Sequence, residues 1–357
     1  MEENKQHKTA LPETEPIPSA QAPEALLDIR DLRVEYHTDE DVVYAVNGLD
    51  LTIGKGESLG LVGETGAGKT TTALSVLRLI ADPPGKIMGG EIWFEGEDML
   101  QAKPARLREI RGSKISVIFQ DPMTSLNPVY SVGDQIAEVI HQHEKCSKEE
   151  GRRKAGDMLE MVGIPRARYD EYPHQFSGGM KQRVVIAMSI ACSPELILAD
   201  EPTTALDVTI QAQVLELMNE LKEKLRTSLL LITHDLGVVA QVCDRVAIMY
   251  AGEIVESGTI AEVFDHPHHP YTIGLFGSIP SLDETAEKLK PISGQMPDPT
   301  ELPEGCAFAP RCPYATGACR TRKPEMTGVG GTQMVRCLAH QGVFESPELM
   351  EEVRHGR

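Results

Sequence analysis

The sequence has no run of about 18 or more apolar residues, the length that a membrane-spanning helix requires. It also lacks the apolar segment of a secretory signal, because residues 1–24 are polar and rich in proline. We therefore expect no membrane span, and we interpret residues 1–26 as a disordered N-terminal tail. Without a secretion signal, disulfide bonds are not expected either.

Positive charge is also scarce. The chain has 35 basic residues against 54 acidic ones, and its formal net charge is -19. A general nucleic-acid binder needs clustered Lys and Arg to displace counterions, and binding to anionic lipid needs a polybasic segment. The sequence has neither, so we exclude nucleic acid as a partner.

The chain does contain short apolar segments that alternate with helical patterns. Residues 27–36 and 42–53 alternate apolar and polar side chains, which is typical of strands. The run at residues 196–199 is continuously apolar, residues 228–233 are apolar between a serine and a threonine, and a helical pattern follows each run. This order predicts an α/β fold with a parallel sheet. Residues 131–163 interrupt it with a purely helical block, which we interpret as an inserted subdomain.

Residues 63–70 match the phosphate-binding pattern G-x-x-x-x-G-K-[ST]. The strand at residues 59–62 precedes them, and we expect the following helix to continue to about Ile80. The glycines allow backbone N–H groups to approach phosphate oxygens. Lys69 adds positive charge near the β- and γ-phosphates, and Thr70 offers a hydroxyl to Mg²⁺.

Polar residues follow three of the apolar strands. Asp200 and Glu201 end one strand, where Asp200 can hold Mg²⁺ and Glu201 can polarise an attacking water. His234 follows the next strand and is expected to contact the γ-phosphate. Gln120 follows the strand at residues 115–119 and can bind Mg²⁺ or the attacking water.

A second helix start with small residues lies at Ser177-Gly178-Gly179, within the segment Phe176–Met180. Such a start exposes backbone N–H groups and the positive end of the helix dipole, so it can also hold phosphate. One chain therefore offers two separate phosphate-binding helix starts.

The order of these motifs along residues 27–263 resembles the ATP-binding-cassette (ABC) ATPases. The resemblance implies a RecA-like core with a parallel sheet, an antiparallel β subdomain, and an inserted helical subdomain at about residues 121–180. It places the ABC ATPase domain at residues 27–264. It also implies a head-to-tail dimer, in which ATP lies between the phosphate-binding loop of one chain and residues 177–179 of the other.

By the same resemblance, Glu201, His234, Lys69 and Gln120 are the catalytic residues. Tyr36 matches the aromatic residue that stacks on adenine, with Tyr44 as an alternative. Mg²⁺ is assigned to Thr70, Gln120 and Asp200. The residues expected to bind ATP are Tyr36, Gly63, Glu64, Thr65, Gly66, Ala67, Gly68, Lys69, Thr70, Thr71, Gln120, Asp200 and His234, and across the dimer Ser177, Gly178, Gly179 and Asp207.

The second helix start departs from the usual family signature Leu-Ser-Gly-Gly-Gln. Phe176 and Met180 replace the leucine and the glutamine, so Met180 cannot make the polar contact of that glutamine. Phosphate contact through Ser177 and the glycine backbone should survive. Phe-Ser-Gly-Gly-Met resembles the peptide-importer branch of the family.

Four cysteines, Cys306, Cys312, Cys319 and Cys337, follow near the C-terminus with the spacing C-x5-C-x6-C-x17-C. Four thiolates can bind zinc or an iron–sulfur cluster, although zinc sites usually have closer pairs. Unligated thiols are the third interpretation. The segment at residues 265–272 and the cysteines resemble the C-terminal extension of oligopeptide/dipeptide importer ATPases, here residues 265–357. That resemblance implies a [4Fe-4S] cluster, with zinc as the runner-up. The histidines at 266, 268 and 269 are interpreted as a structural link before a helix.

The resemblance predicts the ATP-hydrolysing subunit of an importer for di- or oligopeptides, at the cytoplasmic face of the cell membrane. Its partners would be a second ABC ATPase subunit, two membrane permease subunits and an extracytoplasmic peptide-binding protein. The second ATPase subunit is either an identical copy or a paralogue, and the transported molecule stays open. The alternative is a soluble ABC ATPase of DNA repair or translation, but the chain has one cassette and a strong negative charge.

Overall fold

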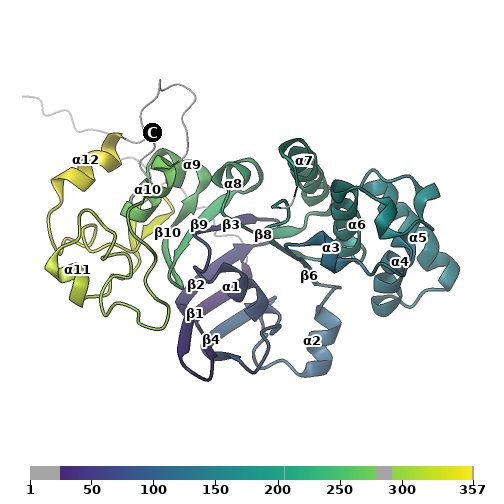
Figure 1. Ribbon diagram of the computed structural model, residues 1–357, viewed down its shortest axis with the longest axis horizontal. Coiled ribbons are helices and arrows are strands. Elements are labelled where there is room, and N and C mark those ends of the chain that lie inside the picture. Colours follow the sequence, from purple (N-terminus) through teal and green to yellow (C-terminus); the bar gives the residue numbers. More distant parts are fainter. Residues whose placement is uncertain (1–24, 205, 279–291, 356–357) are drawn as a thin grey trace, which may run out of the picture.

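A computed structural model describes residues 25–204, 206–278 and 292–355 of the chain (Figure 1). The expected N-terminal tail lies outside these ranges except for Ala25 and Leu26. Those two residues already belong to strand β1, so the tail prediction is wrong for them. No helix of the described residues is long and apolar enough to cross a membrane.

The main sheet has the strand order β11-β12-β10-β9-β3-β8-β7-β6. Strands β6, β7, β8, β3 and β9 run parallel to one another, which confirms the predicted parallel core, whereas β10 pairs antiparallel with β9. Every residue of β3 and of β8 is buried, as expected for parallel strands that helices cover on both faces. The strand bounds are β3 (Ser58–Val62), β6 (Ile115–Ile118), β7 (Leu196–Asp200), β8 (Ser228–Thr233), β9 (Arg245–Tyr250), β10 (Glu253–Thr259), β11 (Thr327–Gly330) and β12 (Gln333–Val335).

A second, antiparallel sheet has the order β2-β1-β4-β5. Its apolar face is buried with Leu27, Ile29 and Leu49 completely enclosed. The helix after the phosphate-binding pattern contributes Val76 and Leu77 to the same core. The bounds are β1 (Ala25–His37), β2 (Val42–Gly54), β4 (Gly85–Phe94), β5 (Glu97–Asp98) and α1 (Lys69–Val76), with α2 (Pro104–Ile110) beyond.

Helix α1 ends four residues earlier than the sequence pattern predicted. Arg78 has a left-handed backbone with φ of 50°, which a helix cannot continue. The guanidinium of Arg111 donates to the carbonyl oxygens of Leu77 (2.6 Å) and Arg78 (3.0 Å). The end of α1 is therefore fixed by a residue that lies more than 30 positions downstream.

The predicted helical block lies at one end of the molecule's long axis (Figure 1). Serine side chains cap three of its helices: Ser131 for α4, Ser147 for α5 and Ser177 for α6. The bounds are α3 (Pro122–Ser125), α4 (Val132–His143), α5 (Lys148–Met161), η1 (Arg166–Arg168), η2 (Pro173–Gln175) and α6 (Gly178–Ile190). The block is therefore helical as predicted, and its limits as a subdomain remain a prediction.

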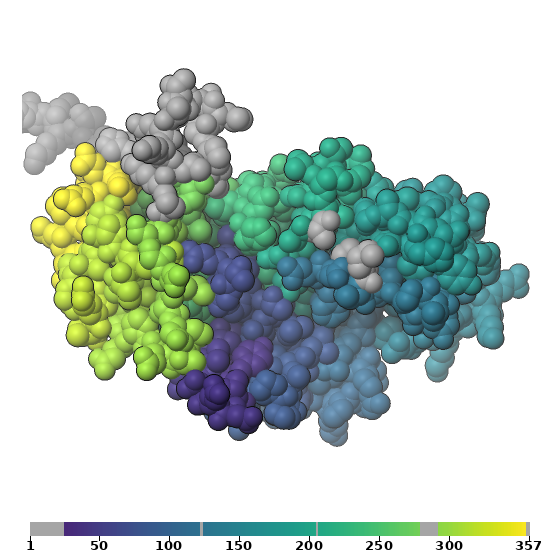
Figure 2. Space-filling view, viewed as in Figure 1, coloured from purple at the N-terminus to yellow at the C-terminus, as the bar shows by residue number. Residues whose placement is uncertain are grey.

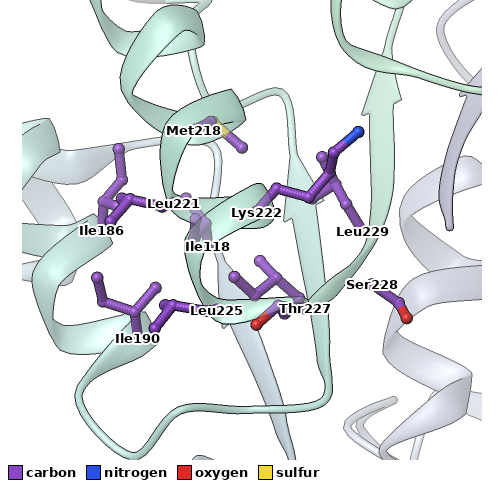
Figure 3. Close-up of a pocket in the computed structure, with 11 residues that line it drawn as sticks. Ile118, Ile186, Ile190, Met218, Leu221, Lys222, Leu225, Thr227, Ser228 and Leu229 are labelled. Carbon is purple, nitrogen blue, oxygen red and sulfur yellow. The ribbon is translucent and has the colours of Figure 1, made fainter. Parts of the chain in front are cut away.

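Helices α6 and α7 (Val208–Leu225) pack on the main sheet. Between them the apolar side chains leave a cavity of about 20 Å³, lined by Ile118, Ile190, Leu225 and neighbours (Figure 3). Lys222 also lines it, and its ammonium group donates to the hydroxyl of Ser58 at 2.7 Å. Most of its lining residues belong to the apolar core, so we interpret it as a packing cavity.

The C-terminal residues lie at the end of the molecule opposite to the helical block (Figure 1). Their strands β11 and β12 extend the main sheet beyond β10, which the sequence did not predict. Helix α10 begins after His269, whose side chain accepts from the backbone N–H of Tyr271 at 3.1 Å. This confirms the histidine segment as a link before a helix. The bounds are α8 (Leu236–Val242), α9 (Ile260–Asp265), α10 (Pro270–Gly277), α11 (Gly317–Thr321) and α12 (Pro347–His355).

Candidate nucleotide site

The phosphate-binding pattern forms a tight loop between β3 and α1, here called the P-loop (residues 63–70). A Cβ atom at Gly63 would lie 2.2 Å from the carbonyl oxygen of Met249. At Gly68 it would lie 2.3 Å from the carbonyl oxygen of Ala45, and Gly68 has φ of 102°. Both positions therefore require glycine, and the start of α1 is held close against β2 and β9.

The side chain of Lys69 points back into the P-loop. Its ammonium group donates to the carbonyl oxygens of Gly63 (2.7 Å) and Glu64 (3.0 Å). Burial lowers the pKa of Lys69, while the nearby carboxylates of Glu201, Asp200 and Glu64 act in the opposite direction. A buried cation thus lies at the N-terminus of α1, where an anionic ligand would be favoured.

Two oxygen ligands lie together beside Lys69. The hydroxyl of Thr70 forms a hydrogen bond with the carboxylate of Asp200, the last residue of β7. Burial raises the pKa of Asp200, and the Thr70 hydrogen bond partly offsets this. A hydroxyl and a carboxylate are the ligand types that Mg²⁺ prefers, so these two residues fit a magnesium site.

Glu201 is the centre of a hydrogen-bonded group. Its Oε2 accepts from Gln120 Nε2 (2.9 Å) and from the hydroxyl of Thr204 (2.9 Å), and its Oε1 lies 3.1 Å from His234 Nδ1. Burial raises the pKa of Glu201, but the hydrogen bonds with His234 and Thr204 outweigh burial and leave the pKa lowered. The carboxylate is therefore ionised at neutral pH and suited to orienting a water molecule.

The backbone of Glu201 is also unusual. Its φ of 46° lies in the left-handed region, which residues other than glycine seldom adopt. Its backbone N–H donates to the carbonyl oxygen of Ile232 on β8 at 2.8 Å. Such conformations occur at functional sites, where the surrounding contacts hold them.

The two candidate adenine contacts differ. The hydroxyl of Tyr36 lies 3.1 Å from the hydroxyl of Thr71 on α1, so this ring is placed beside the helix that follows the P-loop. Tyr44 is 38% exposed, and its backbone N–H donates to the carbonyl oxygen of Pro299 at 2.9 Å. The geometry therefore favours Tyr36 as the aromatic residue beside the nucleotide.

The second helix start lies apart from these residues. Ser177 caps α6 by accepting from the backbone N–H of Met180 at 3.4 Å, and Asp207 caps α7 by accepting from Ile210 at 3.0 Å. Within the described ranges, no hydrogen bond or ion pair joins residues 177–179 to the P-loop. The structure thus brings together Lys69, Thr70, Asp200, Glu201, Gln120 and His234, and leaves the second helix start outside that group.

The two residues that depart from the usual signature share one neighbour, Arg168. Its guanidinium lies 4.2 Å from the ring centroid of Phe176, and Nη1 lies 3.3 Å from the sulfur of Met180. Arg168 also forms an ion pair with Glu171. Phe176 and Met180 therefore both contact Arg168, which the sequence pattern did not predict.

The four C-terminal cysteines line one cavity of about 20 Å³, between α10 and α12. Burial raises the pKa of Cys306 to about 11 and that of Cys312 to about 12, so both are neutral thiols. The cavity is about the size of one water molecule. Among the described residues, no group of His, Cys, Asp or Glu is arranged to hold a metal ion. The predicted iron–sulfur site, and zinc in its place, are thus unsupported by this arrangement.

Sequence reasoning missed several residues of the site. Thr204 contacts Glu201 but follows no strand directly, so its position gave no signal. Glu64 was assigned to ATP alone, yet its carboxylate pairs with Arg311, 247 residues later. No local pattern in the sequence indicates a contact of that range.

Comparison with protein-family models identifies two parts of the chain. Residues 46–204 match the family described as "ABC transporter". Residues 255–319 match "Oligopeptide/dipeptide transporter, C-terminal region". The two matches together include the P-loop, Glu201 with Gln120 and Thr204, the second helix start and three of the four C-terminal cysteines, while His234 lies between the two matched ranges.

Curated relatives match nearly the whole chain. The chain is 51% identical to the oligopeptide transport ATP-binding protein OppD of Bacillus subtilis, over 91% of this chain and 93% of the relative. It is 49% identical to the oligopeptide transport ATP-binding protein AppD of the same organism, over 88% of this chain and 97% of the relative. It is 48% identical to the dipeptide transport ATP-binding protein DppD of that organism, over 88% of this chain and 94% of the relative.

Solved structures match the cassette. A dimeric structure of the ATP-binding cassette MJ0796, bound to ADP and Pi, superposes with a TM-score of 0.59 and 27% identity, over 66% of this chain and 98% of that one. The transporter component cbiO1 of Clostridium perfringens superposes with a TM-score of 0.58 and 27% identity, over 67% of this chain and 90% of that one.

The cassette fold, with the P-loop beside Asp200 and Glu201, defines an ATP-hydrolysing ABC ATPase. The chain belongs to the family of ATP-binding subunits of oligopeptide/dipeptide ABC transporters. This result favours the transporter over a soluble ABC ATPase of DNA repair or translation.

Proposed function

We propose that this chain powers the import of di- or oligopeptides as a peripheral subunit at the cytoplasmic face of the cell membrane. The relatives that match about nine-tenths of the chain carry the names of oligopeptide and dipeptide transport proteins. The second family match covers the C-terminal region that bears that transporter name. These two findings support peptides as the transported molecules.

We assign ATP to the P-loop and the residues beside it. Lys69 would stabilise charge on the β- and γ-phosphates, and Tyr36 would stack on adenine. Bound Mg²⁺ would neutralise charge on the phosphate oxygens. Thr70 and Asp200 would hold the metal, joined by the amide oxygen of Gln120, since the amide nitrogen of Gln120 already donates to Glu201.

Glu201 would orient the attacking water, and His234 would fix Glu201 and contact the γ-phosphate. Because its pKa is lowered, Glu201 is ionised at neutral pH, and its carboxylate can accept a hydrogen bond from the attacking water. The other contacts of Glu201 leave its side chain little freedom.

We propose that Ser177, Gly178, Gly179 and Asp207 act on the ATP of a second ABC ATPase subunit, either an identical copy or a paralogue. The start of α6 lies apart from the P-loop of its own chain, so a second chain is needed to bring the two together. The solved MJ0796 cassette, which shares this fold, is dimeric.

The surface that would receive a membrane permease is an open groove of about 740 Å³, which we call the docking groove. It is lined by side chains from the end of α1, from β6 and from the helical block, among them Leu79, Phe119, Val139 and Met188. Phe119 is 47% exposed and adjoins other apolar residues of the docking groove, so that together they offer an apolar surface to a partner. The docking groove is the observation that carries a role in driving a membrane partner. Two permease subunits and an extracytoplasmic peptide-binding protein complete the proposed transporter.

Uptake of a labelled dipeptide and a labelled pentapeptide tests this function in cells whose own gene for the subunit is replaced by variants. Glu201→Gln should abolish uptake although the purified subunit still binds ATP. Phe119→Asp should also abolish uptake and release the subunit from membranes, with ATP binding unchanged. Glu216→Gln, on the exposed side of α7, is the matched control. Normal uptake without any functional subunit would refute the proposal.

For the four C-terminal cysteines we propose a [4Fe-4S] cluster, with zinc as the runner-up. The proposal rests on the resemblance of the C-terminal region to peptide-importer ATPases, because the cavity as it stands does not support a metal site. A cluster would require the four thiols to move apart and lose their protons. Anaerobic purification of the full chain should give brown protein with about four iron atoms per chain. Colourless protein, with or without one zinc ion per chain, would refute the cluster.

A further inference from the structure

The C-terminal residues lie directly against the P-loop. In the space-filling view, the yellow-green residues of this region adjoin the dark blue residues of the N-terminal part (Figure 2). Within that boundary, Arg311 forms a two-pronged ion pair with Glu64, the second residue of the P-loop. Nη1 lies 2.9 Å from Oε2, and Nη2 lies 3.1 Å from Oε1. Such a pair fixes both the distance and the orientation of the two side chains.

The guanidinium of Arg311 is itself held in place. Its side chain is only 5% exposed. Its Nε donates to the carbonyl oxygen of Ser293 at 3.1 Å, and Nη1 lies 3.4 Å from the hydroxyl of Tyr250 on β9. Arg311 therefore reaches Glu64 from a rigid support, and not as a flexible surface side chain.

A second group from the same region contacts the same P-loop residue. The hydroxyl of Tyr271 on α10 accepts a hydrogen bond from the backbone N–H of Glu64 at 3.0 Å, and Tyr271 is fully buried. The side chain of Met296 lies beside Gly66. A Cβ atom added at Gly66 would lie 3.3 Å from the methyl carbon of Met296. Three residues that follow the cassette thus converge on the first turn of the P-loop.

The position of Glu64 matters for Lys69. The carbonyl oxygen of Glu64 accepts from the ammonium group of Lys69, as does that of Gly63. A shift of Glu64 would therefore move one of the two oxygens that orient the cation of the P-loop. Arg311 acts on Lys69 through one residue, although it lies more than 240 positions away in sequence.

We infer that Arg311 is a positioning residue for ATP, which holds the first turn of the P-loop so that Lys69 meets the phosphates. The C-terminal region thereby sets the affinity of the cassette for nucleotide. This inference rests on the proposed role of the P-loop in binding ATP. It assigns the C-terminal region an effect on the nucleotide that does not depend on whether its cysteines bind a metal.

The test measures binding of a fluorescent ATP analogue to the full chain, together with KM and kcat of the assembled transporter. Arg311→Gln should raise Kd and KM about tenfold, equivalent to about 1.4 kcal/mol, and leave kcat at saturating ATP within about twofold. Arg311→Lys should recover only part of the affinity, because an ammonium group cannot form the two-pronged pair. In a Glu64→Gln background, Arg311→Gln should cause little further loss.

Arg336→Gln is the matched control. Arg336 also joins the C-terminal region to the cassette, through the carbonyl oxygen of Ile254 at 3.0 Å, but it does not touch the P-loop. If Arg311→Gln and Arg336→Gln lower Tm equally and neither changes Kd, the inference is refuted. If Lys69→Met keeps the wild-type Kd, the assignment of ATP to the P-loop fails instead.

Discussion

The helices α1 and α6 both begin with small residues and expose backbone N–H groups, but their own chain completes only one of them. At the start of α1, Lys69 and Thr70 lie beside Asp200, which supplies a cation, a hydroxyl and a carboxylate within one site. At the start of α6, Ser177 caps its own helix, and within the described ranges no hydrogen bond or ion pair joins it to the P-loop. A phosphate-binding helix start needs side chains from other elements, and we propose that α6 obtains them from another chain.

Substitution of Ser177 tests this comparison with the largest expected effect. Ser177→Arg places a long cation at the start of α6, where it should prevent two chains from closing around ATP. We expect turnover to fall by about 100-fold, comparable to the loss of one transition-state donor. The affinity of the single chain for ATP should stay within about twofold. Steady-state hydrolysis and binding of a fluorescent ATP analogue measure the two quantities.

Ser147→Arg is the control for Ser177→Arg, because Ser147 also caps a helix, accepting from Glu150 at 3.2 Å. It should leave turnover near the wild-type value. If Ser177→Arg and Ser147→Arg reduce turnover equally, the loss arises from the helix cap and the asymmetry between α1 and α6 is wrong.

Substitution of Lys69 tests the other helix start. Lys69→Met keeps the length of the side chain and removes its charge, so the P-loop should lose affinity for the triphosphate. We expect Kd to rise by about 10- to 100-fold, as for a charge pair worth about 1.5–3 kcal/mol. Lys86→Met, at an exposed position of β4, should leave Kd unchanged. Equal affinities for the two variants would contradict the role of Lys69.

The smallest expected effect concerns the packing of α6. A Cβ at Gly179 would lie 2.3 Å from Ile210 Cγ2, whereas at Gly178 its nearest neighbour, Leu206, would be 3.7 Å away. Gly179→Ala should therefore lower the free energy of unfolding by about 1–3 kcal/mol, while Gly178→Ala should have a much smaller effect. Urea denaturation of the two variants measures the difference. Ile210→Ala in the Gly179→Ala background should recover part of the loss, and no recovery would contradict the proposed contact.

The sequence predicted the parts of the molecule that depend on local pattern. These parts include the glycines of the P-loop, the apolar runs of β7 and β8, and the polar residues that follow each run. Their positions relative to one another are fixed along the chain. The contacts of Glu201 with Gln120 and His234 follow from those positions, because parallel strands bring their carboxyl ends together. The candidate functional residues could therefore be named before their distances were known.

Contacts over long range were not predictable in the same way. The end of α1 depends on Arg111, and β12 pairs with β10 across more than 70 intervening residues. The pair of Arg311 and Glu64 depends on how the C-terminal region folds back on the cassette. In each case two unremarkable polar or apolar residues meet because of the tertiary fold, and neither carries a signal in its own segment.

The left-handed backbone of Glu201 has a consequence for engineering this protein. A residue other than glycine in that conformation is destabilised by about 1 kcal/mol or more, and glycine would remove that strain. Glycine at position 201 would also remove the carboxylate that we propose orients water, together with its contacts with three other side chains. The molecule thus carries backbone strain at the residue whose carboxylate we propose orients the attacking water.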